Sequence, residues 1–215
     1  LNNPGSPVAI SFGQTLPGII SFPAEMDSYT FTANAGDKVL VRMSRSTGTL
    51  WPGIRIYTPD GVKLCDQSAS TTSEILSCTL STTGTYTILA YDGYDGTRTG
   101  DYYLYLQRLN NPGSPVAISF GQTLPGTVSF PAEMDTYSFS IGGSDVASVT
   151  MTLVTGNIWP GIRIYSSGGV KLCEQSGSST ATISNCSLPA SGTYYILAFD
   201  GYDGTRIGSY TIYLH

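Results

Sequence analysis

The chain has 215 residues, of which 40% are hydrophobic and only 12% are charged, so it has enough apolar material for a folded core. Its formal net charge is −5 and its few basic residues form no cluster, which excludes a surface that follows the phosphates of a nucleic acid. No run of about 18 apolar residues is present, so the sequence also excludes a helix that inserts into a membrane.

The sequence repeats itself with a period of 108 residues, and Leu1 aligns with Leu109 without a gap up to the last residue. Of the 107 aligned positions, 68 are identical. A unit of this length can bury a core of its own, so we predict two domains, residues 1–108 and 109–215. No Gly/Ser-rich spacer separates them, which favours a restricted angle between the domains. We also expect the two units to belong to a longer array of repeats.

Short runs of β-branched and aromatic residues follow one another through each unit, and turn residues separate most of them. No segment shows the period of an amphipathic helix. The turn-like sequences "NAGD" at 34–37 and "PDG" at 59–61 predict hairpins. About eight or nine strands per unit predict an all-β fold, with two tandem antiparallel β-sandwiches of jelly-roll type. In the first unit the predicted strands are, in chain order, 8–12, 18–22, 28–33, 38–44, 53–58, 62–67, 74–80, 85–91 and 101–107.

Each unit has two cysteines with the same spacing, and we predict that they form the disulfides Cys65–Cys78 and Cys173–Cys186. A zinc site is disfavoured because the single histidine is His215 and four ligands are normally needed. Two buried free thiols are the alternative. A disulfide in each unit implies an oxidising compartment, so we expect a secreted or cell-surface protein.

Three segments in this order resemble the bacterial pre-peptidase C-terminal domain: "MDSYTFTANAGDKVLVRMS", "PGIRIYTPDGVKL" and "STTGTYTILAYDGYDGTRTGDYYLYL". The resemblance covers roughly residues 26–106 and again 134–214. It implies a non-catalytic β-sandwich that is attached to secreted enzymes and surface proteins. It also implies a relation to collagen-binding or carbohydrate-binding modules, some of which calcium stabilises.

The heptapeptide "DGYDGTR" is unchanged between the two units, at 92–98 and 200–206. Carboxylate oxygens are hard ligands, and glycine lets backbone carbonyls approach an ion, so this loop predicts a calcium site. Six to eight oxygens are needed, and other acidic side chains and the amides of Asn2 and Asn3 are candidates to complete the set. In the alternative, the aspartates accept hydrogen bonds from turn amides, and Arg98 and Arg206 pair with them. The predicted carboxylate ligands are Asp92, Asp95, Glu25 and Asp27, and in the second unit Asp200, Asp203, Glu133 and Asp135.

The segment "WPGIRIY" is a second candidate site, at 51–57 and 159–165. A tryptophan at the start of a strand offers a flat apolar face for a sugar ring or a collagen side chain. A loop tyrosine offers a second face, so we predict ligand contacts at Trp51 and Tyr94 and at Trp159 and Tyr202. In the alternative, the tryptophan closes one end of the sandwich.

Catalysis has little support in the sequence. A Ser–His–Asp or Cys–His arrangement is excluded by the single terminal histidine, and only a paired-carboxylate glycosidase remains as a formal alternative. We therefore predict a non-catalytic structural or adhesive repeat module, a stalk or fibre whose partners are neighbouring repeats. The second hypothesis is a module of a secreted hydrolase that binds a glycan or an extracellular protein such as collagen.

Overall fold

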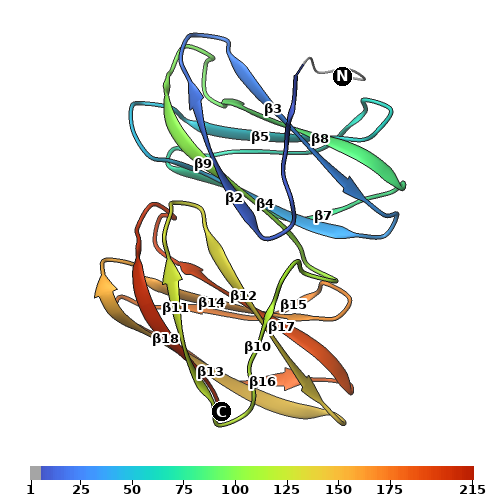
Figure 1. Cartoon of the computed structure of the whole chain (residues 1–215), viewed down its shortest axis with the longest axis vertical. Helices are drawn as coiled ribbons and strands as arrows, with labels where there is room; N and C mark the ends of the chain where they lie inside the picture. The colour runs from blue at the N-terminus through green and yellow to red at the C-terminus, as the bar shows by residue number, and fades with distance from the viewer. Residues whose placement is uncertain (1–5) are drawn as a thin grey trace. The chain divides into compact units, whose positions relative to one another are not determined.

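The computed structural model describes residues 6–215, which fold into two compact units that divide between Arg108 and Leu109. Strands are the only regular elements of these residues, with nine strands in each unit (Figure 1). No helix in residues 6–215 is long and apolar enough to cross a membrane.

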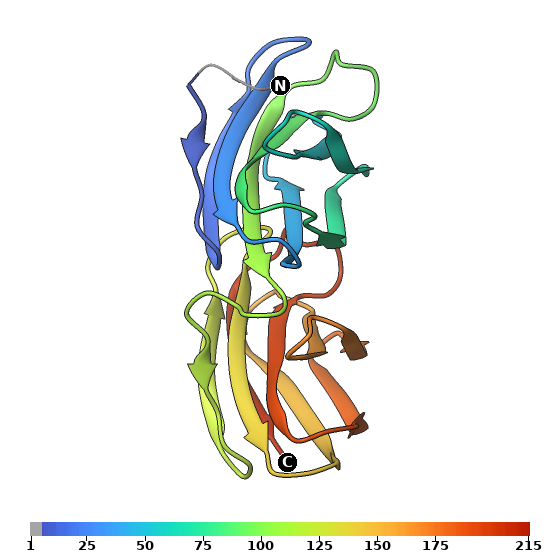
Figure 2. The ribbon, with the colours of Figure 1, turned by 90° about the vertical axis from the view of Figure 1, so that its right-hand side faces the viewer.

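The first unit consists of a five-stranded and a four-stranded sheet (Figures 1 and 2). The five-stranded sheet has the order β1 (Val8–Ala9), β3 (Met26–Ala33), β8 (Gly84–Asp92), β5 (Pro52–Tyr57) and β6 (Lys63–Ser68). The four-stranded sheet has the order β2 (Gln14–Ile20), β9 (Gly100–Arg108), β4 (Lys38–Arg45) and β7 (Thr72–Thr79).

The second unit repeats both sheets in the same order. Its five-stranded sheet is β10 (Val116–Ala117), β12 (Met134–Ile141), β17 (Gly192–Asp200), β14 (Pro160–Ser166) and β15 (Lys171–Ser176). Its four-stranded sheet is β11 (Thr123–Val128), β18 (Gly208–Leu214), β13 (Asp145–Gly156) and β16 (Thr180–Leu188).

The strand order confirms the predicted jelly-roll sandwich. Without the short first strand, eight strands remain in each unit, four in each sheet. Apart from β5 and β6 and their counterparts β14 and β15, successive strands pass between the sheets, as in two interleaved Greek keys. One detail of the prediction is wrong, because not every pair is antiparallel. Strand β1 pairs with β3 in parallel, and β10 pairs with β12 in the same way. After this short pairing the chain crosses to the other sheet, so no hairpin forces the two strands to run in opposite directions.

One of the two predicted hairpins is also wrong. Residues 34–37 connect β3 to β4, which lie in different sheets, so this turn is a connection between the sheets. Gly36 does supply the positive φ, at 88°, that made the segment look like a hairpin turn. Residues 59–61 connect β5 to β6, which pair directly, so the second predicted hairpin is confirmed.

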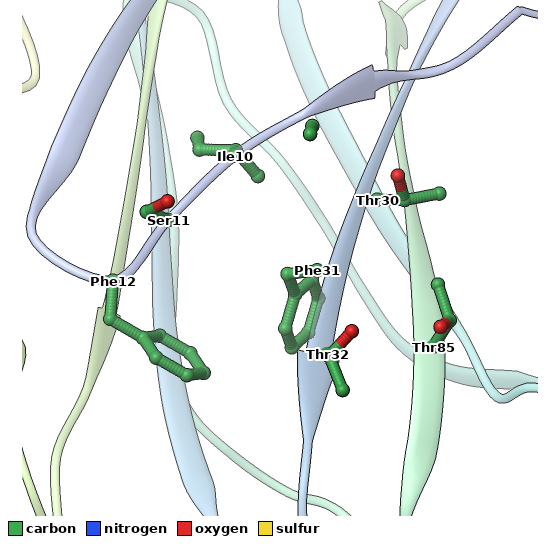
Figure 3. A pocket seen from close by; sticks show the side chains of 8 residues that line it. Ile10, Ser11, Phe12, Thr30, Phe31, Thr32 and Thr85 are labelled. Carbon is green, nitrogen blue, oxygen red and sulfur yellow. The ribbon is translucent and has the colours of Figure 1, made fainter.

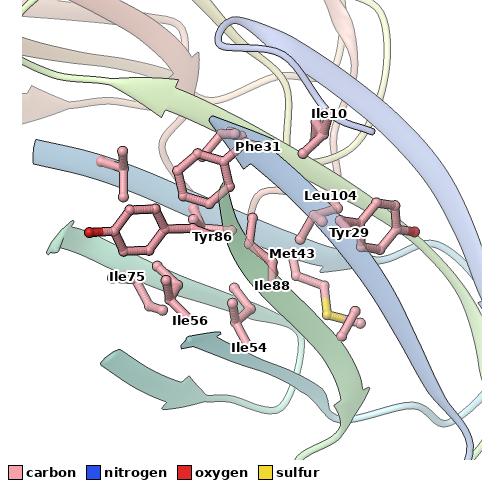
Figure 4. Packing of buried hydrophobic residues seen from close by; sticks show 14 of the residues in the cluster. Ile10, Tyr29, Phe31, Met43, Ile54, Ile56, Ile75, Tyr86, Ile88 and Leu104 are labelled. Carbon is pink, nitrogen blue, oxygen red and sulfur yellow. The ribbon is translucent and has the colours of Figure 1, made fainter. Parts of the chain in front are cut away.

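Alternate residues of the strands fill the space between the two sheets. In the first unit Phe31 stacks on Tyr86 with ring centroids 5.6 Å apart, and isoleucines of β5 and β8 pack beside them (Figure 4). The corresponding pair in the second unit is Phe139 and Tyr194, at 5.8 Å. Each fully buried side chain of this size contributes about 1.5 to 3 kcal/mol, so the two cores hold most of the stabilising free energy.

The predicted disulfides are confirmed in both units. Cys65 of β6 bonds to Cys78 of β7 with a Cα–Cα distance of 6.3 Å, and Cys173 bonds to Cys186 at 6.0 Å. Because β6 and β7 are edge strands of different sheets, the bond links the two layers of the sandwich. No free cysteine is present among the described residues.

Candidate binding site

The unchanged heptapeptide forms the loop that leads from the end of β8 to β9, and the carboxylate of Asp92 organises it. One oxygen accepts a hydrogen bond from the N–H of Trp51 at 3.2 Å. The other oxygen accepts hydrogen bonds from Gly96 at 2.8 Å and from Arg98 at 3.2 Å. Asp92 is only 6% exposed, and amide N–H groups of this kind satisfy a buried carboxylate. In the second unit the carboxylate of Asp200 accepts the same three bonds, from Trp159, Gly204 and Arg206.

The second aspartate of the loop stabilises a tight turn. Asp95 accepts hydrogen bonds from the backbone N–H of Thr97 at 3.0 Å and from its hydroxyl at 2.7 Å. These bonds favour the charged form and lower the pKa of Asp95. Gly96 takes a φ of 77°, a conformation that other residues adopt only with strain. In the second unit Asp203 makes the same bonds to Thr205, which lower its pKa although partial burial opposes them.

The loop brings three side chains together, which we call the Trp–Tyr–Arg cluster: Trp51, Tyr94 and Arg98. The rings of Trp51 and Tyr94 have centroids 5.2 Å apart. The guanidinium carbon of Arg98 lies 4.1 Å from the centroid of Tyr94 and 5.5 Å from that of Trp51. Tyr94 is 60% exposed, whereas Trp51 is half-buried. The structure therefore brings together both ligand-contact residues predicted for the first unit.

The second unit carries the same cluster, formed by Trp159, Tyr202 and Arg206. The two rings are stacked with centroids 5.0 Å apart, and the guanidinium lies 4.0 Å from the centroid of Tyr202. Tyr202 is also 60% exposed. The guanidinium lies against the rings, where a cation–π contact forms. Its charge also helps to lower the pKa of the loop carboxylate of Asp203, as the predicted pairing of arginine and aspartate implies.

Glu25 is not part of the cluster. Its carboxylate accepts hydrogen bonds from the N–H groups of Ser21 and Phe22 in the turn between β2 and β3. The backbone of that turn does contact the loop, because the N–H of Ala24 donates to the carbonyl of Gly96 at 2.7 Å. In the second unit Glu133 accepts the equivalent bonds from Ser129 and Phe130.

Asp27 belongs to a different group of side chains. It accepts a 2.6 Å hydrogen bond from the hydroxyl of Tyr102, whose oxygen lies 2.8 Å from that of Tyr29. Because Asp27 is in β3 and Tyr102 is in β9, these bonds link the two sheets. Burial raises the pKa of Asp27.

The second unit has the same inter-sheet link. The hydroxyl of Tyr210 donates to Asp135 at 2.6 Å and lies 2.9 Å from the hydroxyl of Tyr137. Burial raises the pKa of Asp135 to about 6, and the bond from Tyr210 opposes the rise only in part. These tyrosines were not predicted as part of a site, because their signal in the sequence is weak. It consists of a Tyr two residues after each aspartate and a distant Tyr in the last strand of each unit.

The predicted calcium ligands do not form a cage. The carboxylates of Asp92, Asp95 and Glu25 accept hydrogen bonds in their own turns, and Asp27 is held by a tyrosine. Within residues 6–215 no group of three or more His, Cys, Asp or Glu side chains is placed to hold a metal ion. Asn2 and Asn3 lie outside the described residues. The arrangement fits the turn alternative better than the six to eight oxygens of a calcium site.

A hollow of about 380 Å³ lies elsewhere in the first unit, beside β1 and β3. Phe12 and Phe31 face it from two segments, and the rest of its lining consists of small aliphatic and hydroxyl side chains (Figure 3). None of the lining residues is ionisable, so this hollow offers no acid–base chemistry.

The comparison with known families agrees with this architecture. Residues 25–92 match the family model of the bacterial pre-peptidase C-terminal domain. The matched segment lies within the first unit and is similar to this family. The match includes β3 to β8 and ends at Asp92, the residue that organises the loop. The match confirms the resemblance inferred from the sequence for this segment, and the second unit repeats its sequence and strand order.

Solved structures with a similar arrangement include two bacterial examples. The pre-peptidase C-terminal domain of Bacillus anthracis collagenase is 16% identical and covers 49% of this chain and 98% of its own, with a TM-score of 0.41. A periplasmic inhibitor of g-type lysozyme from Salmonella Typhimurium is 19% identical and covers 48% of this chain and 99% of its own, with a TM-score of 0.36. No curated protein sequence matches the chain.

Proposed function

We propose that the chain is a non-catalytic structural and adhesive repeat module of a secreted or cell-surface protein, in which such units make a stalk or fibre. The observation that carries this proposal is the repetition of one disulfide-linked sandwich with one exposed Trp–Tyr–Arg cluster. A disulfide that links the two sheets in each unit suits an oxidising extracellular environment. Adhesion gains from repetition, since several weak contacts to one surface act together.

The chemistry of the loop supports a non-catalytic role. A general acid or base needs a proton that it can exchange with a bound substrate. The buried carboxylate of Asp92 accepts hydrogen bonds from three backbone N–H groups, so it holds the conformation of the loop. Asp27, whose raised pKa is of interest for acid catalysis, is hydrogen-bonded to Tyr102 between the sheets.

A second candidate function is a ligand-binding module attached to a secreted hydrolase. The observation that favours it is the 60% exposure of Tyr94 and Tyr202, each beside a half-buried tryptophan. An exposed aromatic pair of this kind suits contact with a glycan or an extracellular protein such as collagen.

The parent gene distinguishes the two functions. The stalk or fibre predicts an open reading frame with further units of about 108 residues, each with the disulfide and the heptapeptide. A reading frame in which only these two units stand beside a protease or glycosidase domain would contradict it and favour the appended module. The gene can be sequenced directly from the source of the chain.

A further inference from the structure

The Trp–Tyr–Arg cluster combines the features that a sugar-binding site needs. Tyr94 offers an exposed aromatic ring, and the half-buried Trp51 supports it from 5.2 Å away. Arg98 adds hydrogen-bond donors next to these rings, since its guanidinium donates to no other described side chain or carbonyl. Asp95 lies in the same loop, next to Tyr94, and its exposed carboxylate adds hydrogen-bond acceptors. A stacking face with a donor and an acceptor beside it matches the apolar face and the hydroxyls of a pyranose ring.

The charges of the loop favour a neutral ligand. Each loop has two carboxylates and one guanidinium, and the chain as a whole has a net charge of −5. A polyanionic glycan would meet repulsion at such a surface, because the single cation beside Tyr94 is outnumbered. A neutral sugar avoids this cost and still uses the donors of Arg98 and the acceptors of Asp95.

One buried carboxylate positions all the elements of the cluster. Asp92 bonds to the backbone of Trp51, to Gly96 after the exposed tyrosine, and to Arg98. The N–H of Gly93 also donates to the carbonyl of Trp51 at 2.7 Å, so the tryptophan and the loop are joined by two hydrogen bonds. One carboxylate oxygen binds the backbone of Trp51 and the other binds the backbone of the loop, at Gly96 and Arg98. The carboxylate therefore fixes the spacing between the rings and the guanidinium.

We propose that the Trp–Tyr–Arg cluster of each unit binds a pyranose residue of a neutral glycan, and that Asp92 and Asp200 are positioning residues that hold the cluster in its binding geometry. The proposal deepens the adhesive function and rests on it. It also explains why the heptapeptide is unchanged while the surrounding strands differ between the units: the turn, the ring, the acceptor and the donor all lie within it. The aspartates act here through backbone hydrogen bonds.

The test uses the 215-residue chain on an array of neutral and acidic oligosaccharides, the neutral ones containing glucose, mannose, galactose or N-acetylglucosamine. We expect binding to at least one neutral glycan and at least a tenfold loss of affinity in the variant Tyr94→Ala/Tyr202→Ala. The matched control is Phe22→Ala/Phe130→Ala, which removes two other exposed aromatic rings and should bind as the original chain does. Binding to no neutral glycan, binding to acidic glycans only, or an equal loss in the control would overturn the proposal.

The positioning role has its own readout. Asp92→Asn/Asp200→Asn replaces one acceptor oxygen by an amide group that repels the N–H groups of the loop. We expect a tenfold or larger loss of affinity together with a weaker near-ultraviolet circular dichroism signal from the Trp–Tyr pairs. Asp60→Asn, in the turn between β5 and β6, should change neither quantity. Unchanged affinity in a folded Asp92→Asn/Asp200→Asn variant would contradict the positioning role. If the chain binds no glycan but the parent gene holds many units, the sugar site fails and the repeat module stands.

Discussion

The half-buried aspartate between the sheets of the second unit, Asp135, allows a quantitative prediction of how stability depends on pH. The pKa of Asp135 is about 6 in the folded unit against an ordinary value of 3.8. The folded unit therefore binds this proton more tightly than the unfolded chain does. The resulting stabilisation is fully present below about pH 3.8 and is lost as the pH rises through about 6. A shift of this size corresponds to roughly 3 kcal/mol, and because Asp135 is only partly buried we expect about 1 to 2 kcal/mol.

The variant Asp135→Asn isolates this contribution. Its amide oxygen can still accept the hydrogen bond from Tyr210, and it carries no charge to desolvate. We expect its free energy of unfolding to exceed that of the original chain by about 1 to 2 kcal/mol at pH 7.5 and to equal it near pH 4. The chain has two tryptophans, so in a Trp51→Phe background urea unfolding followed by the fluorescence of Trp159 reports on the second unit.

Asp203→Asn is the matched control for this experiment. The pKa of Asp203 is lowered, so its contribution is present above its unfolded value and is lost as the pH falls. Replacing it should not stabilise the unit at pH 7.5. The reasoning is refuted if Asp135→Asn destabilises the second unit at pH 7.5, or if the stability of the original chain does not rise as the pH is lowered from 7.5 towards 4.

Three further predictions follow from the contacts within the units. Replacing Cys65 and Cys78 by Ala should lower the free energy of unfolding of the first unit by about 3 kcal/mol, measured by thermal melting. An unchanged melting temperature would show that the disulfide does not stabilise the unit. Gly18→Ala should destabilise the same unit by about 1 to 3 kcal/mol, because the new Cβ would lie 2.2 Å from the ring of Tyr102; an unchanged melting temperature would disprove this close contact. Adding calcium or a chelator should leave the melting temperature unchanged, whereas a rise with calcium would restore the predicted metal role of Asp92.

The repeat, the strands and the disulfides could be predicted because each leaves a local signal. Strand residues alternate, turns carry glycine, and the two cysteines recur at one spacing in both units. The connection made by the turn at 34–37 could not be predicted in this way. Its composition is the same whether it joins neighbours in one sheet or crosses between sheets, so only the packing of the whole unit decides.

The candidate site was only partly predictable for the same reason. The pairing of Trp51 with Tyr94 follows from two motifs that the fold brings together, and the sequence already indicated both residues. The hydrogen-bond partner of each carboxylate could not be predicted from the sequence. Acidic side chains near one another in sequence can ligate a metal or accept amide hydrogen bonds, and the backbone geometry of the loop determines which occurs.

The proposed adhesive role depends on one binding cluster in each unit. Isothermal titration calorimetry with a neutral oligosaccharide that the array identifies tests it most directly. We predict a stoichiometry of two sugars per chain, one after Tyr94→Ala and none after Tyr94→Ala/Tyr202→Ala. Binding that persists with the same stoichiometry and affinity in the double variant would contradict the claim.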